Sequence, residues 1–468
     1  MQIRSVAKEI QLVILANIAI AIALAIVVVH LPLQTSLMIL ALGGGFIIAM
    51  FVVSLLGWKR LKNITLYGYV FLAAAVQSDI GWISIAGRQI PAYVLVLPAL
   101  IIFLVLQRLE RSRGSSFIVR PLLKELVWAI VLLVIVLLSL IIVAPNPLKS
   151  TIEALQLGVF ICGYFIVAFL VDDRRLWKQL VLIFILTFIG FSLIALYRYF
   201  VQPVHWHRLI ISEGKRPNQL AFVMETPVLV LFSILFTLRA RQASKLQWGL
   251  YLSGFVILLT SFMLIVSRGA WIAAFVGAAV FGLLSLPKIK FQRIIAIGFF
   301  GFLFSLVMIA IIGLSVITNR LAFVSESVHR RFAGSSENRL EVFQIYVDQI
   351  LQTPFLGSGY GVVLQEADFG DVYGAKGAHN SYLAVWTDSG VFAFLSMMGF
   401  LIVHGANLWQ VRHKMNEDIL WGNIFIGIYI AALVHMLAAN FFFSNFFWST
   451  FAFQAAAIHA YSGQESDQ

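Results

Sequence analysis

Gly377-Ala378-His379-Asn380-Ser381-Tyr382-Leu383 joins a polar segment to an apolar run that begins at Asn380. The polar segment extends from Asn319 to Ala378 and is the longest in the chain. Loops of such length without secondary structure of their own are uncommon and are usually functional. The stretch therefore marks the point where a water-exposed loop meets an apolar frame.

The composition indicates an integral membrane protein. Of the 468 residues, 61% are hydrophobic and 12% are charged, whereas soluble domains carry about 25% charged residues. About fourteen apolar runs approach the ~20 residues that a helix needs to cross a bilayer, and two of them are short. We expect an all-α, polytopic transmembrane bundle of about 12–14 helices. The runs lie near residues 11–31, 36–56, 64–79, 91–107, 124–143, 151–171, 178–200, 218–238, 247–266, 270–285, 294–317, 380–407, 417–437 and 442–460.

Positive charge alternates between the loops that join these runs. One set of loops is rich in Lys and Arg, and the alternating set is nearly bare. Because Lys and Arg near helix ends mark the cytoplasmic side, we expect both termini in the cytoplasm and the bare loops outside. The same bias explains the net charge of +12 better than a nucleic-acid partner does, so we expect none.

The chain is expected to have three regions. Residues 1–317 would form transmembrane helices with short loops, and residues 318–379 one long periplasmic or extracytoplasmic loop that contains short helices. Residues 380–468 would form the C-terminal transmembrane helices and a short cytoplasmic tail. The single cysteine, Cys162, excludes an intrachain disulfide.

A helix is predicted in the long loop after Asn338, and Thr353-Pro354 would end it. We expect its apolar stripe to lie against the membrane domain. The following Gly357-Ser358-Gly359-Tyr360-Gly361 is expected to be a flexible turn, and it lacks the features of a phosphate-binding fingerprint. The stripe consists of Leu340, Phe343, Val347, Ile350 and Leu351.

His379 is the best candidate for chemistry, because the only long outward loop leads directly to it. An imidazole with an ordinary pKa near 6.5 accepts a proton at physiological pH. The alternative is an ordinary histidine at the membrane interface. A metal site is not expected, because no Cys or carboxylate stands at ligand spacing from His205 and His207.

Two arginines on the outward side are candidates for binding an anion. Arg216 precedes Pro217, where a helix is expected to begin, so its guanidinium and the free N–H groups could share one phosphate. Pairing with a lipid phosphate is the alternative. Arg268 lies between two apolar runs, where a charge costs about 2.5–3.5 kcal/mol on insertion scales. We favour a functional role for it over an interfacial one beside Trp271.

Glu225 lies one or two turns inside its predicted helix. We expect it to pair with an arginine, and the sequence leaves open whether it is a paired structural carboxylate or a catalytic one. Arg339, at the start of the loop helix, would add positive charge from that side.

Three motifs in order resemble the O-antigen ligase family. They are Ser267-Arg268-Gly269-Ala270-Trp271, then Asn338-Arg339-Leu340 with the segment from Thr353 to Gly361, and His379-Asn380-Ser381-Tyr382-Leu383. The resemblance covers roughly residues 200–410. The family includes lipopolysaccharide O-antigen ligases, Wzy-type polysaccharide polymerases and protein O-oligosaccharyltransferases.

The resemblance implies a GT-C-like glycosyltransferase of the bacterial inner membrane that uses no metal ion or other cofactor. Its donor would be a glycan on undecaprenyl pyrophosphate, and its acceptor a lipid A-core or another glycan. The essential histidine of the family falls on His379 and one essential arginine on Arg216. The second falls on Arg268 or, as the alternative, on Arg339. Asn380 and Tyr382 would also contact substrate.

This assignment agrees with the chemistry of the residues. The arginines would bind the pyrophosphate leaving group bidentately, and His379 would be the general base for the acceptor hydroxyl. A single displacement would invert the anomeric carbon, with no carboxylate pair required.

Two alternatives remain open. A Wzy-type polymerase would use the same site residues with a lipid-linked repeat as acceptor. A membrane transporter belongs to another class, but transporters commonly show internal repeats and ionisable residues near the midplane. In this chain the ionisable candidates fall near the outer interface, and no repeat is evident.

Overall fold

The computed structural model describes residues 57–75, 82–85, 88–110, 120–145, 147–201, 217–237, 244–265, 267–286, 337–359, 380–416, 420–442 and 444–462. Two compact units divide the chain, Met1–Thr65 and Leu66–Gln468. Of the first unit the structure describes the start of helix α3 (Trp58–Ala75), where the ammonium groups of Lys59 and Lys62 lie over the Trp58 ring. All packing described below lies within the second unit.

The second unit is helical apart from one short hairpin in its described part. Its elements are β1 (Trp82–Ile85), β2 (Arg88–Pro91), η2 (Ala92–Val96), α4 (Leu97–Glu110), α5 (Arg120–Val143), α6 (Pro147–Leu170), α7 (Arg174–Val201), α8 (Pro217–Thr237), α9 (Lys245–Leu264), α10 (Arg268–Ser285), α13 (Glu337–Gln352), α15 (Ser381–Met415), α16 (Trp421–Met436) and α17 (Asn445–Ser462). The antiparallel hairpin pairs Trp82 with Pro91 and Ile85 with Arg88.

Among the described helices, eight are long and apolar enough to cross a membrane, and α16 is a shorter apolar helix. The expected all-α membrane bundle is therefore confirmed, and eleven of the fourteen predicted runs coincide with these helices, α3 and α17. The runs at 11–31, 36–56 and 294–317 lie outside the described residues. The sequence did not predict the hairpin, because its strands are only 4 residues each.

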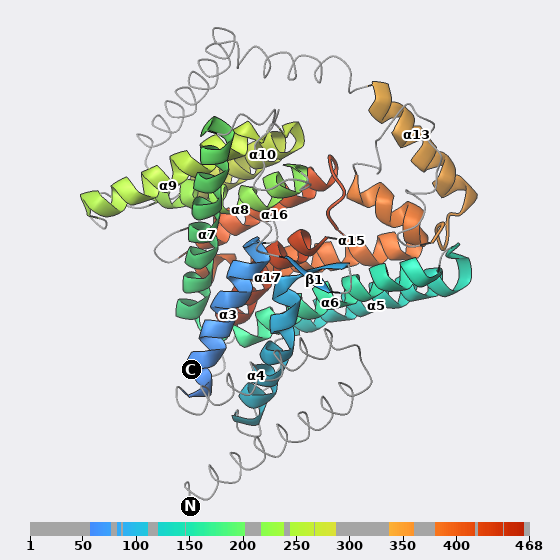
Figure 1. The fold of residues 1–468 in the computed structure, drawn as a ribbon, viewed down its shortest axis with the longest axis horizontal. Helices are drawn as coiled ribbons and strands as arrows, with labels where there is room; N and C mark the ends of the chain where they lie inside the picture. Colours follow the sequence, from blue (N-terminus) through green and yellow to red (C-terminus); the bar gives the residue numbers. More distant parts are fainter. Residues whose placement is uncertain are drawn as a thin grey trace, which may run out of the picture. The chain divides into compact units, whose positions relative to one another are not determined.

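Small residues allow the closest contact between helices. A side chain on Gly277 of α10 would lie 2.7 Å from the Gly427 carbonyl of α16, and a side chain on Gly427 would lie 2.5 Å from the Gly277 carbonyl. Two backbones can approach this closely only where neither residue has a Cβ, as at many helix crossings in membranes. Figure 1 shows α16 beside α10, and α5 lying along α15 with α6 next to it.

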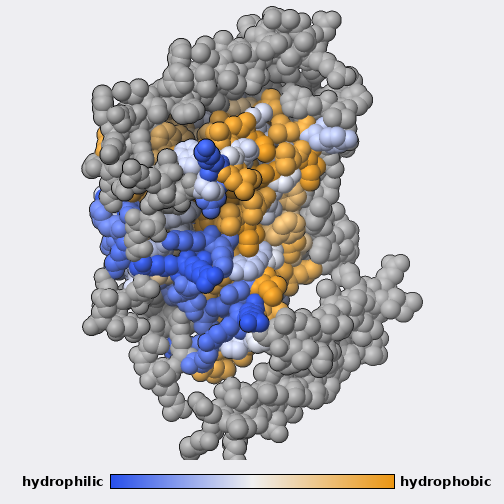
Figure 2. Space-filling model, turned by 90° about the vertical axis from the view of Figure 1, so that its left-hand side faces the viewer, coloured by the Kyte–Doolittle hydropathy of each residue, from blue (hydrophilic) through white to orange (hydrophobic). Residues whose placement is uncertain are grey.

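Hydrophobic residues cover much of the outer surface of the bundle. Large apolar side chains of α5 are among the most exposed, with Ile141 at 75% and Ile142 at 61%. Figure 2 shows a broad hydrophobic area on the visible face with hydrophilic residues gathered beside it. Exposed aliphatic side chains on long apolar helices are the pattern expected for surfaces that contact lipid.

Helix α15 is broken at Gly390, where φ is 80°. The break leaves backbone groups without helical partners, and in an apolar environment each such group costs several kcal/mol. The turn that follows α13 supplies the partners. The hydrogen bonds are Val391 N to Pro354 O (2.9 Å), Ser358 N to Thr387 O (2.9 Å) and Gly359 N to Asp388 O (3.1 Å).

This junction corrects the prediction of a flexible turn. Gly357 and Gly359 have φ of 70° and 107°, and their backbones are hydrogen-bonded or packed against α15 and the end of α5. Ser139 of α5 also donates to Leu356 O at 2.7 Å. The glycines are needed for positive φ and close approach, and the described part of the turn, up to Gly359, is held in place.

Helix α13 was predicted correctly in extent, but its buried face differs in part from the expected stripe. Tyr346 and Ile350 are 2% and 7% exposed, whereas Phe343 and Leu351 are 46% and 73% exposed. The buried residues lie four apart, so one narrow face of the helix packs on the bundle. Phe343 and Leu351 lie off that face.

Replacing Gly390 by Ala tests the junction. A Cβ at this position would collide with the Phe355 carbonyl, and φ there lies in the left-handed region. We expect Gly390→Ala to lower the free energy of unfolding by about 2–4 kcal/mol, seen as a lower thermal midpoint in detergent. Gly282→Ala in α10 is the matched control, because a Cβ there meets nothing within 4 Å. An unchanged thermal midpoint for Gly390→Ala would contradict the requirement for glycine at this junction.

Candidate active site

The first turn of α15 is fixed by a side-chain cap. Asn380 Oδ1 accepts hydrogen bonds from Tyr382 N at 2.9 Å and from Leu383 N at 3.1 Å. Asn is favoured at such positions because its side chain satisfies N–H groups that have no partner within the helix. His379 precedes this cap directly in the chain and itself lies outside the described residues. The cap therefore fixes the first turn of the helix that follows His379 in the sequence.

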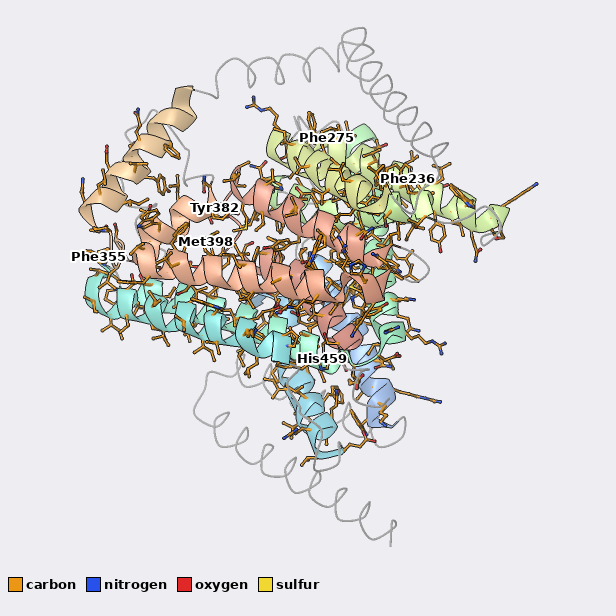
Figure 3. The ribbon with its side chains drawn as sticks, turned by 180° about the vertical axis from the view of Figure 1, so that it is seen from behind. Phe236, Phe275, Phe355, Tyr382, Met398 and His459 are labelled. Carbon is orange, nitrogen blue, oxygen red and sulfur yellow. The ribbon has the colours of Figure 1, made fainter. Side chains whose placement is uncertain are left out.

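The same turn is bonded to the connection between α16 and α17. Ser381 Oγ donates to Ala439 O at 2.8 Å and accepts from Phe441 N at 2.9 Å. Tyr382 OH donates to Leu433 O of α16 at 3.1 Å. Figure 3 shows Tyr382 near the start of α15. These bonds attach the start of α15 to the end of α16.

The first turn of α10 contacts the end of α16 from another side. Arg268 is the first residue of α10. A Cβ on Gly269 would lie 2.5 Å from the Ala438 Cβ and 3.6 Å from the His435 Cδ2 atom. Gly269 therefore allows α10 to approach His435 closely, and Arg268 projects from the turn that makes this contact.

Helix α8 reaches the same place through its second and third turns. The Phe222 ring stacks on Phe441 with centroids 4.5 Å apart. Glu225 forms an ion pair with His435 through Oε1 and Nδ1, and the two residues are 2% and 0% exposed. The expected pairing of Glu225 with an arginine is therefore wrong, because its partner is the imidazole of α16.

The starts of α8, α10 and α15 thus meet at the C-terminal end of α16. These are the helices that begin at, or directly follow, Arg216, Arg268 and His379. Arg216 lies outside the described residues, as His379 does. Arg339 lies in α13, and its side chain is outside the described part. The structure therefore brings together the first turns of three helices: α10, which begins with Arg268, and α8 and α15, which follow Arg216 and His379 in the sequence.

The opposite end of α16 is rich in basic residues. A Cβ on Gly422 would lie 2.7 Å from the Arg412 Cα atom. The Arg174 guanidinium lies 4.4 Å from the Tyr461 ring centroid, and Trp177 packs on Trp421 with centroids 5.3 Å apart. Because α16 has 16 residues, its two ends are about 24 Å apart. The candidate site and the basic side chains therefore lie at opposite ends of the bundle.

A second buried polar cluster lies between α5, α6, α15 and α17. His404 Nδ1 is 3.2 Å from Glu125 Oε2, and Tyr164 OH donates to the same carboxylate. Asn407 Nδ2 donates to Glu125 Oε1 at 2.7 Å, and Gln454 Oε1 lies 2.9 Å from His404 Nε2. Glu125 and His404 are both fully buried. All polar side-chain atoms of Glu125 and His404 therefore have partners within the cluster.

The sequence analysis missed this cluster and the role of His435. The available signal was an ionisable residue inside an apolar run, which is rare in membrane helices and marks a polar partner nearby. His404 and His435 both have this context. Their partners lie on helices far away in the chain, so the pairing itself was not evident.

The described residues contain no group of three or more His, Cys, Asp or Glu side chains that could hold a metal ion. At the end of α16, the described groups suited to an anion are Arg268, the first residue of α10, and the N-termini of α8, α10 and α15. A helix N-terminus carries free N–H groups and a partial positive charge, and it favours anions.

Replacing His404 by Leu tests the buried cluster. The change leaves the Glu125 carboxylate buried without its imidazole partner, and breaking a buried ion pair costs about 3–5 kcal/mol. We expect a thermal midpoint lower than that of the parent protein in detergent. Replacing Glu125 by Gln keeps oxygen and nitrogen atoms in the cluster and is expected to cost less. Equal midpoints for His404→Leu and the parent would contradict the assignment.

Comparison with known protein families finds a match within the chain. Residues 253–398 match the O-antigen ligase family, which confirms the resemblance over that part of the chain. The matched stretch runs from α9 into α15 and includes Arg268, Arg339 and His379, whereas Arg216, Glu225 and His435 lie outside it. No curated protein matches the chain at a significant level.

Proposed function

We propose that this chain, whose residues 253–398 match the O-antigen ligases, transfers a glycan from undecaprenyl pyrophosphate to an acceptor hydroxyl at the outer face of the bacterial inner membrane. The observation that carries the proposal is the meeting of the starts of α8, α10 and α15 at one end of α16. Arg268 is the first residue of α10, and Arg216 and His379 stand just before α8 and α15 in the sequence.

The charge distribution supports the proposed orientation. Arg174 and Arg412 lie at the other end of α16, and basic residues mark the cytoplasmic side of membrane proteins. The candidate site then faces the periplasm, where a lipid-linked glycan is presented. The apolar outer surfaces of the helices would contact the polyprenyl chain in the bilayer.

The reaction is a single displacement. The acceptor hydroxyl gives its proton to the imidazole of His379 as its oxygen attacks the anomeric carbon. The bond between this carbon and the phosphate oxygen breaks, and its electron pair remains on the lipid pyrophosphate. Arg216 and Arg268 stabilise the negative charge that develops on that leaving group. The anomeric carbon is inverted, and no metal ion takes part.

The acceptor is most simply the lipid A-core, which makes the enzyme an O-antigen ligase. A Wzy-type polymerase uses a second lipid-linked repeat as acceptor with the same site chemistry. Purified protein supplied with donor and each acceptor separately distinguishes the two activities by the product formed.

The broken helix α15 is the feature that favours a transporter, since transporters bind substrate at interrupted helices. In this protein the break at Gly390 is filled by the turn at Pro354–Gly359, which takes up the backbone groups that the break leaves free. The interruption therefore serves a contact within the fold, and we favour the enzyme.

Replacing His379 by Ala tests the proposed base. We expect the rate of glycan transfer to fall by a factor of about 10²–10⁴ because general base catalysis is lost, measured with purified protein, lipid-linked donor and acceptor. His413→Ala is the matched control, since His413 lies at the other end of α15. If the His379→Ala variant transfers glycan at the rate of the parent protein, His379 is not the general base and the proposed mechanism is wrong.

Replacing Arg268 or Arg339 by Lys identifies which of the two is the second arginine that binds the pyrophosphate. A lysine keeps the charge but loses the fork that binds a phosphate bidentately. We expect Arg268→Lys to lower kcat by at least about tenfold, and Arg339→Lys to lower it by less than threefold. The reverse result would place the second arginine on α13.

A further inference from the structure

The imidazole of His435 contacts α8, α10 and the connection that follows α16. It is fully buried and forms the ion pair with Glu225 of α8. Its ring packs edge-on against Phe441 with centroids 4.7 Å apart. On the α10 side, its Cδ2 atom lies 3.6 Å from the place where a Cβ on Gly269 would stand.

The neighbours of His435 carry this contact on to α15. Phe441 N donates to Ser381 Oγ, and Ser381 belongs to the turn that follows His379. Ala438, one turn-length beyond His435, contacts the Gly269 position directly. A shift of the imidazole would therefore displace the starts of α10 and α15 relative to each other.

Stability alone is a weak explanation for this ion pair. Charged pairs buried in a low-dielectric interior are often no more stabilising than well-packed apolar residues, because desolvation offsets their attraction. The Glu125–His404 pair is surrounded by three further polar partners, whereas His435 Nε2 has no hydrogen-bond partner among the described residues. What distinguishes the Glu225–His435 pair is its location between the starts of three helices.

We propose that Glu225 and His435 are positioning residues for glycan transfer, which hold the turn of Arg268 at a fixed distance from the turn that follows His379. The inference rests on the proposed function. The ion pair between the Glu225 carboxylate and Nδ1 fixes the orientation of the ring. The ring then sets the separation of α10 and α15 by contact with Gly269 and Phe441.

The expected effect on catalysis is large because the reacting groups lie on different helices. A misplacement of about 1 Å can cost about 10²-fold in rate. The arginine stabilises charge that develops in the transition state, so its displacement lowers kcat more than it raises the KM for the donor.

The kinetic test compares two buried Glu–His pairs in the same chain. We expect His435→Leu and Glu225→Leu to lower kcat, per folded molecule, by at least about tenfold, with the donor KM changed by less than about threefold. Glu225→Gln should keep kcat within about threefold of the parent, because its amide oxygen still accepts from Nδ1. The matched controls, His404→Leu and Glu125→Gln, should lower the thermal midpoint but leave kcat of the folded protein within about twofold.

A second measurement does not depend on activity. Spin labels at Ile272 of α10, which is 60% exposed, and at Leu383 of α15 report the separation of the two helix starts in a Cys162→Ser background. We expect a broadened or shifted distance distribution in His435→Leu and the parent distribution in His404→Leu. If His435→Leu does not fold, His435→Gln and Glu225→Leu take its place in both measurements.

The outcomes separate the two proposals. An unchanged kcat and distance distribution in the folded His435 and Glu225 variants would overturn the positioning role, and so would an equal loss of kcat in His404→Leu. A changed distance distribution in a protein that transfers no glycan even before substitution would overturn the proposed function and leave the positioning contact established.

Discussion

The arrangement of this protein depends on one constraint of the apolar environment, that a polar group outside a helical ladder needs a partner within the protein. Three places in the second unit show how it is met. The break at Gly390 receives its hydrogen bonds from Pro354–Gly359, Ser381 bonds the backbone after α16, and Glu125 is bonded to side chains of two other helices. Each solution connects segments that are distant in sequence.

The candidate site follows from the same constraint. The start of a helix has N–H groups without partners, and the starts of α8, α10 and α15 gather where α16 ends. Asn380 satisfies two of these groups in α15. Arg268 is the first residue of α10, and Arg216 and His379 precede α8 and α15 in the sequence. In the proposed function, these residues would bind the pyrophosphate leaving group and deprotonate the acceptor hydroxyl.

Six of the glycines that the structure describes divide into two kinds. Gly277, Gly427 and Gly269 are small so that α10 can approach α16, whereas Gly357, Gly359 and Gly390 have positive φ that other residues rarely adopt. The first kind sets the distance between helices, and the second forms the junction between the loop helix α13 and the broken helix α15. Both kinds lie next to the elements that carry the candidate site residues.

The sequence by itself determined the class of fold and the extent of most helices, because a run of apolar residues long enough to cross a bilayer has few other structures open to it. It also indicated His379, Arg268 and Arg216 through their position at helix starts, and these assignments remain predictions. The tertiary structure alone decided which distant residues meet. Glu225 was expected to pair with an arginine and pairs with His435, and the turn expected to be flexible fills the break at Gly390. Hydrophobic periodicity specifies which segments are buried, but the partner of a buried polar group depends on how the helices pack, and that is fixed by contacts across the whole bundle.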